Sequence, residues 1–438
     1  MIQIVTNTQS NRLRYTLDFI FNEVLGVTYV LMDELENCDK TKGPVILYND
    51  SDVNTPHIKM FPQGLLDQSD ITDCTEVMYK LTEKILATLQ KGETINEDIF
   101  SLIFFIISRY EEYFPHQADQ LGRYQAKNSV SYQLQILDRA IVDECILNLK
   151  NTISEKYPNY VFPNIKKFAI HSTIDIDQVW AYAHKGFRNV AGGIKDLIKG
   201  NLFSFKRRLS SFNNYKNDPF NTYELIESLH KKYQIIPNYF VLFASKTSTY
   251  DKNHDISETN FQIKIKALAE KNVVGIHPSF RSNEDPNVLS SEIKNLNNLL
   301  KTKITTSRQH FIKLELPTTY RNLILNGIKE DYSMGYPEEN GYRAGTGHPF
   351  YWYDLTNECV TDLMIYPFQI MDVTLKNYKK LSASHAKTEI GKFIKYAKKI
   401  DSPLCVIWHN SSLDEGGIWS GWKGVYEYLL SGGQEMGG

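Results

Sequence analysis

The feature that most constrains the fold of this chain is a regular alternation of strand-like and helix-like segments after residue 160. Short apolar segments rich in β-branched and aromatic residues are followed by longer segments whose apolar residues recur at helical spacing. This alternation is typical of a parallel sheet built from βαβ units. The expected strands are residues 168–176, 238–243, 273–276, 311–314, 328–332, 363–367 and 404–408, and the expected helices are residues 222–233, 261–271, 288–300 and 318–326.

The first 160 residues have a different pattern. Apolar segments at 1–6 and 45–48 predict strands, and apolar residues at helical spacing predict helices over 12–25, 75–90, 96–113 and 136–157. Pro158 and Pro163 interrupt the last helical pattern and indicate a boundary. A length of 438 residues also favours two domains. We therefore expect a mixed α/β domain over residues 1–160 and a larger β/α domain over residues 161–438.

Charge and composition exclude several classes of partner. The formal net charge is -2, so bulk electrostatics do not indicate a nucleic-acid partner. The N-terminus lacks the basic start and apolar core of a signal peptide, and the most apolar stretch, 99–107, is too short to cross a bilayer. Five dispersed cysteines without a C-x-x-C pair indicate free thiols. We expect a cytoplasmic protein without a membrane span; the oligomeric state is left open.

One segment departs from this neutral balance. Residues 185–217 are rich in lysine and arginine. This pattern favours a solvated insertion or surface helix, and a patch for an anionic substrate or partner is the alternative.

Two aspartates stand where the first expected strand of the second domain ends. Asp175 and Asp177 are two positions apart, so both side chains project from the same side of the strand. Two carboxylates at close range repel each other and resist burial unless a cation or a proton lies between them. Their position therefore indicates a functional site.

Other polar residues lie near the ends of later expected strands. His277 and His409 each follow such a strand, His310 directly precedes one, and Arg343 lies in a glycine-containing segment. Barrel strands bring such residues to one rim, where active sites form. Carboxylate and imidazole are ligands that zinc and related divalent ions prefer. The sequence thus predicts a metal-hydrolase site.

These residues resemble the motifs of the polysaccharide deacetylase family (NodB-homology, carbohydrate esterase family four). Residues 173–177 are similar to the family's Thr-x-Asp-Asp motif, in a bacterial variant with an apolar residue between the two aspartates. Residues 341–346, 349–355 and 108–113 also resemble that variant. The resemblance covers nearly the whole chain. It implies a distorted (β/α) barrel preceded by a smaller mixed α/β domain of unknown role.

The resemblance also implies a reaction and a role for each site residue. A divalent ion, with zinc expected, would help to hydrolyse an N-acetyl or O-acetyl group of a sugar or polysaccharide precursor. Asp175 would be the general base, His409 the general acid, and Arg343 would contact Asp175. The expected catalytic residues are Asp175, Arg343 and His409, the expected metal ligands are Asp177, His277 and His310, and the expected sugar contacts are Tyr342, Trp408 and Asn410.

One position departs from the family pattern. The family has a second histidine four residues after the first, and here that position is Arg281. His310 is the best replacement ligand, and His348 is the second candidate. A missing ligand leaves an alternative open, namely an inactive barrel that binds glycans or assembles a polysaccharide-synthesis complex. A metal amidohydrolase for a non-sugar amide is a third possibility.

Overall fold

The computed structural model describes residues 1–39, 43–50, 57–164 and 167–433. The N-terminal part forms a small sheet of four strands in the order β2-β1-β3-β4, and every pairing in it is parallel. Its strands are β1 (Ile2–Val5), β2 (Tyr29–Met32), β3 (Val45–Tyr48) and β4 (Ile58–Met60), and its helices are α1 (Asn11–Leu17), α2 (Thr75–Lys91), α3 (Ile99–Ile107), α4 (Val130–Gln133) and α5 (Ile141–Lys156).

Two of the expected N-terminal helices differ from the observed ones for local reasons. The helix expected over 12–25 is α1 followed by a π-helical segment, Asp18–Val24. The helix expected over 96–113 is shorter, because Arg109 has a φ of 56° and the left-handed conformation ends α-helical hydrogen bonding. Its N-terminus is set by Asp98, whose carboxylate accepts a hydrogen bond from the backbone N–H of Ser101 over 2.9 Å.

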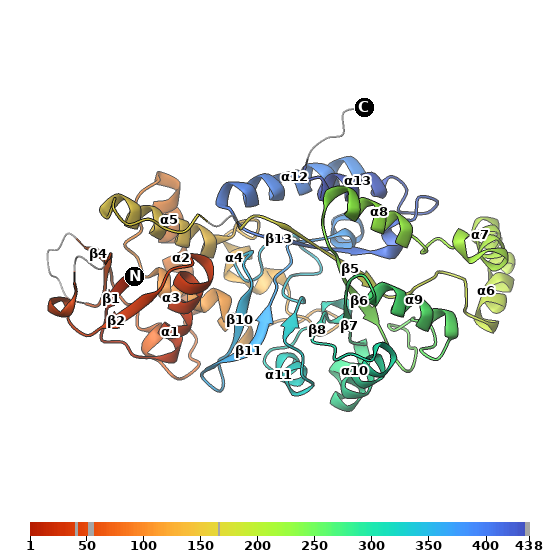
Figure 1. Cartoon of the computed structure of the whole chain (residues 1–438), viewed down its shortest axis with the longest axis horizontal. Coiled ribbons are helices and arrows are strands. Elements are labelled where there is room, and N and C mark those ends of the chain that lie inside the picture. The colour runs from red at the N-terminus through yellow and green to blue at the C-terminus, as the bar shows by residue number, and fades with distance from the viewer. Residues whose placement is uncertain (40–42, 51–56, 165–166, 434–438) are drawn as a thin grey trace.

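The second part of the chain forms a curved sheet of nine strands (Figure 1) in the order β10-β11-β9-β8-β7-β6-β5-β13-β12. All neighbours are parallel except the antiparallel pair β10 and β11. Within the described residues β10 and β12 are not paired with each other, so the expected barrel is an open sheet. The strands are β5 (Ile170–Ile176), β6 (Asn238–Leu242), β7 (Val273–His277), β8 (Thr306–Ser307), β9 (Glu330–Asp331), β10 (Phe350–Asp354), β11 (Cys359–Ile365), β12 (Ile370–Met371) and β13 (Leu404–His409).

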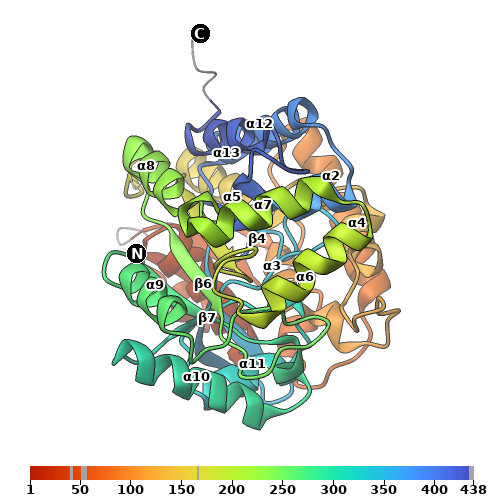
Figure 2. The same ribbon diagram turned by 90° about the vertical axis from the view of Figure 1, so that its right-hand side faces the viewer.

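Helices lie around the outside of this sheet, and a hairpin of two helices, α6 and α7, projects from one end (Figures 1 and 2). α12 and α13 were not among the expected helices. The helices are α6 (Phe187–Ile198), α7 (Leu202–Asn213), α8 (Tyr223–Tyr233), α9 (Thr259–Ala269), α10 (Pro286–Leu300), α11 (Thr318–Leu325), α12 (Ala383–Ile400) and α13 (Trp422–Leu430).

The strand expected over residues 311–314 is wrong. The segment His310–Ile312 is a short 3-10 turn, and Phe311 has a φ of 59°, which no strand residue adopts. The strand in this part of the chain is β8, which lies just before the 3-10 turn. The error matters for the site, because His310 follows a strand where the sequence placed it before one.

One large hydrophobic cluster of the described residues runs through both parts of the chain. Phe104 of α3 and Tyr353 of β10 belong to it, with ring centroids 5.2 Å apart. Polar contacts also connect the two parts: the Nε atom of Arg12 donates to Glu358 over 3.0 Å. The N-terminal part therefore supports the β10–β11 edge of the large sheet. Among the described residues, no helix is long and apolar enough to cross a lipid bilayer.

Candidate metal centre

Parallel pairing brings the functional candidates to one edge of the large sheet. Asp175 near the end of β5 is in register with His409 at the end of β13. His277 ends β7, where it is in register with the last residue of β6. Because parallel strands end together, these three side chains and the two that follow nearby, Asp177 and His310, occupy one region.

Asp177, His277 and His310 form a cluster whose potential ligand atoms all lie within 4.8 Å of one another. The Oδ1 atom of Asp177 is 3.4 Å from Nε2 of His277 and 3.6 Å from Nε2 of His310. Ligands at ~2 Å from a tetrahedral ion lie about 3.3 Å apart, so this spacing suits a metal such as zinc. Oδ1 of Asp177 is also buried and has no hydrogen-bond partner among the described residues, as expected for an atom that needs a cation.

The backbone and a second carboxylate orient the two imidazoles. Nδ1 of His277 lies 2.6 Å from the carbonyl oxygen of Arg308, and Nδ1 of His310 lies 3.0 Å from Oδ1 of Asp251. Both partners accept hydrogen bonds, so each Nδ1 carries the hydrogen and each Nε2 presents a lone pair to the cluster. Carboxylate–histidine pairs of this kind are the usual support of metal-bound imidazoles.

The electrostatics of the cluster match this arrangement. Burial works against ionisation of Asp177, but the neighbouring His310 and His277 hold the pKa of its carboxyl well below its usual range. Burial lowers the pKa of His310, but the carboxylates of Asp177 and Asp251 outweigh it and raise that pKa to about 9. Both shifts show that the carboxylates of the cluster favour a positive charge at this position, which a divalent ion would supply.

Asp175 is buried next to this cluster and forms an ion pair with Arg308. Its Oδ1 atom accepts a hydrogen bond from Nη1 of Arg308 over 3.2 Å, and its Oδ2 atom lies 3.9 Å from Nε2 of His277. Arg308 is fully buried. It is fixed by the Thr173 hydroxyl at 2.7 Å and the Tyr332 carbonyl at 3.0 Å. The carboxylate is therefore held between the guanidinium and the metal cluster.

The arginine expected to contact Asp175 was Arg343, and this assignment needs correction. Arg343 is buried elsewhere, where its Nε and Nη2 atoms donate to both oxygens of Glu112 over 2.9 and 2.6 Å. Arg109 donates to the same carboxylate over 2.7 Å. These groups connect the N-terminal part to the loop before β10, so Arg343 has a structural environment and Arg308 occupies the position beside Asp175.

His409 lies on β13, the strand next to that of Asp175, and is paired with an aspartate that the sequence did not indicate. Nδ1 of His409 is 2.8 Å from Oδ1 of Asp372, and the backbone N–H of His409 donates to the other oxygen over 2.7 Å. Burial lowers the pKa of His409, but Asp372 and then Asp177 and Asp175 raise it to about 10. The imidazole is therefore a protonated group at neutral pH.

Two of the three expected sugar contacts, Trp408 and Tyr342, are buried in packing contacts outside this cluster. Trp408 is opposite Ile174 in the sheet, on the other face from His409, and its ring packs 4.8 Å from that of Tyr426. Tyr342 is buried against Phe393 of α12, at a centroid distance of 6.0 Å.

The amide of Asn410 is likewise used inside the protein. It donates to the carbonyl oxygens of Gln178 and Phe220 over 3.0 and 2.9 Å. The expectation of sugar contacts therefore needs correction. All three side chains are buried, because strand alternation and local hydrogen bonds direct them toward the protein interior.

The two remaining candidates are also outside the cluster. Arg281 is exposed on the 3-10 turn Phe280–Asn283, so it does not replace a ligand. His348 lies in a loop that Asp143 holds through the backbone N–H of Gly347, at 3.1 Å. His310 is thus the histidine that the fold brings to Asp177 and His277.

Sequence reasoning missed Arg308, Asp251 and Asp372. Each follows a strand of the large sheet: Arg308 follows β8, Asp372 follows β12, and Asp251 lies in the loop after β6. Placement after a strand was the only signal that could have found them. It was hidden because β8 and β12 are two residues long and carry no detectable alternation.

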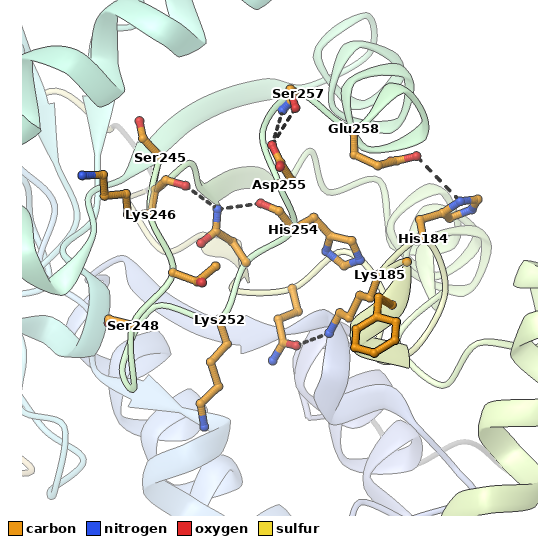
Figure 3. A pocket seen from close by; sticks show the side chains of 16 residues that line it. His184, Lys185, Ser245, Lys246, Ser248, Lys252, His254, Asp255, Ser257 and Glu258 are labelled. Carbon is orange, nitrogen blue, oxygen red and sulfur yellow. Dashed lines mark hydrogen bonds and ion pairs between the residues drawn. The ribbon is translucent and has the colours of Figure 1, made fainter. Parts of the chain in front are cut away.

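A cavity of about 1140 Å³ (Figure 3) lies next to Gln178, the residue that follows Asp177. Two loops line it, from Gln178 to Phe187 and from Ala244 to Glu258. The three candidate ligands do not line it. The hydroxyl of Ser248 also donates to Asp251 over 3.0 Å. The cavity therefore adjoins the cluster through these two loops.

The charge of the cavity wall is mainly basic. The side chains of Lys185, Lys246 and Lys252 line it (Figure 3). The acidic residues of the wall have local partners: Asp255 accepts from Ser257 over 2.9 Å, and Glu258 caps α9 through the N–H of Phe261. A wall that carries charges of both signs suits a polar ligand.

Comparison with known proteins gives limited matches. Residues 2–158 match a family described as a family of unknown function, DUF7033. No curated protein matches the chain.

Several solved structures resemble the chain at low identity. A candidate polysaccharide deacetylase from Mycobacterium smegmatis is 11% identical, with a TM-score of 0.41, and the match covers 62% of this chain and 86% of that one. A polysaccharide deacetylase from Bacillus cereus is 12% identical, with a TM-score of 0.32, and covers 61% and 87%. The PuuE allantoinase is 11% identical, with a TM-score of 0.37, and covers 62% and 85%. Because these scores are low, the function proposed below is based on the geometry of the site.

Proposed function

We propose that this protein is a metal-dependent hydrolase that removes N-acetyl or O-acetyl groups from a sugar or polysaccharide precursor. The observation that carries the proposal is the convergence of three ligand atoms within 4.8 Å, on Asp177, His277 and His310. Asp175 and His409 flank this cluster and are in register on neighbouring strands. Ligands, a base and an acid in one place are the parts that hydrolysis of an acyl group requires.

Asp177, His277 and His310 would hold the ion, and their ligand set of one carboxylate and two imidazoles suits zinc. A bound divalent ion would lower the pKa of a water molecule and polarise the acyl carbonyl group. The orphan oxygen of Asp177 supports this proposal, since it is buried without a hydrogen-bond donor among the described residues. Asp251 and the carbonyl of Arg308 would keep both Nε2 atoms directed at the ion.

Asp175 would act as the general base. The guanidinium of Arg308 donates a hydrogen bond to the Oδ1 atom of Asp175 over 3.2 Å and fixes the orientation of the carboxylate. Its second oxygen remains on the side of the cluster, 3.9 Å from His277. A carboxylate in that place can take a proton from the attacking water.

His409 would act as the general acid. The pair with Asp372 keeps the imidazole protonated at neutral pH, since it raises the pKa to about 10 despite burial. With Nδ1 directed to Asp372, Nε2 is the atom that can donate a proton to the leaving amine or alcohol. The products would be acetate and the deacetylated sugar.

The test is acetate release from a panel of N-acetylated and O-acetylated sugars, compared with simple amides. We expect Asp175→Asn and His409→Gln to lower turnover by about 10²–10⁴-fold while metal content and melting temperature change little. Asp255→Asn is the matched control, because this carboxylate bonds Ser257 in its own turn. Undiminished acetate release by both variants would refute the assignment.

The same experiment separates the alternatives. Stoichiometric metal with hydrolysis of amides but not sugars would favour an amidohydrolase for another substrate. Purified protein without metal that nevertheless binds sugars would favour an inactive glycan-binding or assembly module. The presence of His310 in the cluster speaks against that module, because it supplies the third ligand that Arg281 does not.

A further inference from the structure

The helical hairpin of α6 and α7 stands apart from the main body of the protein (Figure 1). It projects from the end of the large sheet (Figure 1). Among the described residues, no side chain of α6 or α7 belongs to a hydrophobic core cluster or is an apolar side chain packed against one. A helix pair of this length normally depends on an apolar face buried in a core.

The apolar side chains of the hairpin instead face solvent. In α6 they recur as Phe187, Val190, Ile194, Leu197 and Ile198, a spacing that places them on one face. Phe187 is 83% exposed and Ile198 is 81% exposed. In α7, Leu202 and Phe212 are 57% and 72% exposed.

The contact between the two helices combines polar groups with the ring of Phe205, which faces Gly193, and it does not cover these faces. Arg208 of α7 pairs with Asp196 of α6 over 3.0 Å and donates to the amide oxygen of Asn189 over 2.8 Å. Its guanidinium lies against Gly192, where a Cβ atom would lie only 2.6 Å from it. The helices approach through small and polar residues and Phe205, so their apolar faces remain available for another partner.

The charge of the hairpin identifies the chemistry of that partner. Residues 185–217 contain eight lysines and arginines and one acidic residue, although the formal net charge of the whole chain is -2. Lys195, Lys199, Lys206 and Lys216 are exposed and have no ion-pair partner in the described part of the chain. Exposed apolar stripes flanked by lysines are the signature of helices that lie in the interface of an anionic bilayer.

The hairpin is held in a fixed place at its base. The carboxylate of Asp218 accepts hydrogen bonds from the backbone N–H groups of Ala181, Tyr182 and Ala183 over 2.7, 2.8 and 2.9 Å. Arg207 pairs with Asp414 in the loop after β13. A surface that binds the hairpin would therefore orient the whole protein.

We propose that α6 and α7 dock in the plane of an anionic phospholipid membrane, with their apolar side chains inserted among the lipids and their lysines at the headgroups. A second copy of the chain is disfavoured because two cationic hairpins would repel each other. Nucleic acid would use the lysines but leave the apolar stripes in water.

Phe187 and Lys185 also line the cavity beside the metal cluster, so docking brings the mouth of this cavity to the lipid surface. The proposal does not depend on the proposed hydrolase activity.

The test is flotation of the full-length protein with vesicles of phosphatidylcholine alone and of equal parts of phosphatidylcholine and phosphatidylglycerol. We expect binding to the anionic vesicles that weakens as salt is raised. Ile198→Glu should weaken that binding by roughly tenfold or more, since a charged side chain at this position would no longer be inserted among the lipids. Lys195→Glu combined with Lys199→Glu should also weaken it.

Matched controls make the outcome specific. Leu325→Glu on α11 changes a side chain that is 82% exposed outside the hairpin, and Lys294→Glu reverses an exposed charge on α10. Both should bind vesicles as the unmodified protein does. The proposal is overturned if the unmodified protein does not float with anionic vesicles or if Ile198→Glu binds as well as Leu325→Glu. A dimer in light scattering that Ile198→Glu abolishes would also overturn it and assign the stripes to a second copy.

Discussion

The Nδ1 atom of His310 lies 3.0 Å from a carboxylate oxygen of Asp251, a residue 59 positions earlier in the chain. Asp251 is buried and also accepts hydrogen bonds from the backbone of Phe280 and the hydroxyl of Ser248. The loop after β6 therefore fixes the orientation of a side chain from the loop after β8.

Replacement of Asp251 by asparagine should weaken metal binding by about 10–100-fold, because the imidazole of His310 loses the charged acceptor that orients it. The measurement is the zinc dissociation constant, obtained by competition with a chelator. Asp255→Asn, in the same loop, should leave the constant unchanged. Equal affinities for both variants would show that Asp251 does not support the site.

His310→Ala should lose stoichiometric metal in elemental analysis, because only Asp177 and His277 would remain of the cluster. Arg281→Ala should keep its metal, since that side chain is exposed. If the first variant retained full metal content, the third ligand would have to be another residue.

Arg308 and Arg343 provide a matched pair of buried arginines. Arg308→Lys keeps the charge but cannot make the contacts to Thr173, Asp175 and Tyr332 together, so kcat should fall at least about tenfold with little change in KM.

Arg343→Lys breaks the bidentate pair with Glu112 and should lower the melting temperature without a comparable loss of kcat per folded molecule. The comparison combines steady-state kinetics with thermal melts. A larger fall in kcat for Arg343→Lys than for Arg308→Lys would reverse the two roles.

Asp372→Asn should shift the alkaline limb of the pH–rate profile to lower pH. His409 must be protonated to act as an acid, so activity is present below its pKa and is lost as the pH rises through it. Asp372 helps to raise that pKa to about 10, and removal of its charge lowers it. The profile of kcat against pH measures the shift; an unmoved limb would mean that His409 is not the acid.

Local sequence patterns were sufficient for several of the long elements, but not for α12, which has 18 residues and was not expected. The apolar segments around β5, β7 and β13 and the helical spacing of α8 and α10 are strong signals, because buried strands and amphipathic helices must repeat with fixed periods. The two-residue strands β8, β9 and β12 are too short to have a period. Their positions depend on pairing with distant neighbours, and the wrong strand at 311–314 shows the result.

The sequence alone determined that Asp175, Asp177, His277 and His409 follow core strands, and parallel topology then requires such residues to meet at one edge of the sheet. Only the tertiary structure decided which histidine completes the cluster and which arginine accompanies Asp175. Those choices rest on contacts between residues 59 and 133 positions apart, from His310 to Asp251 and from Arg308 to Asp175. No local period records such a contact, because its free energy comes from burial and hydrogen bonding between loops that meet only in the folded chain.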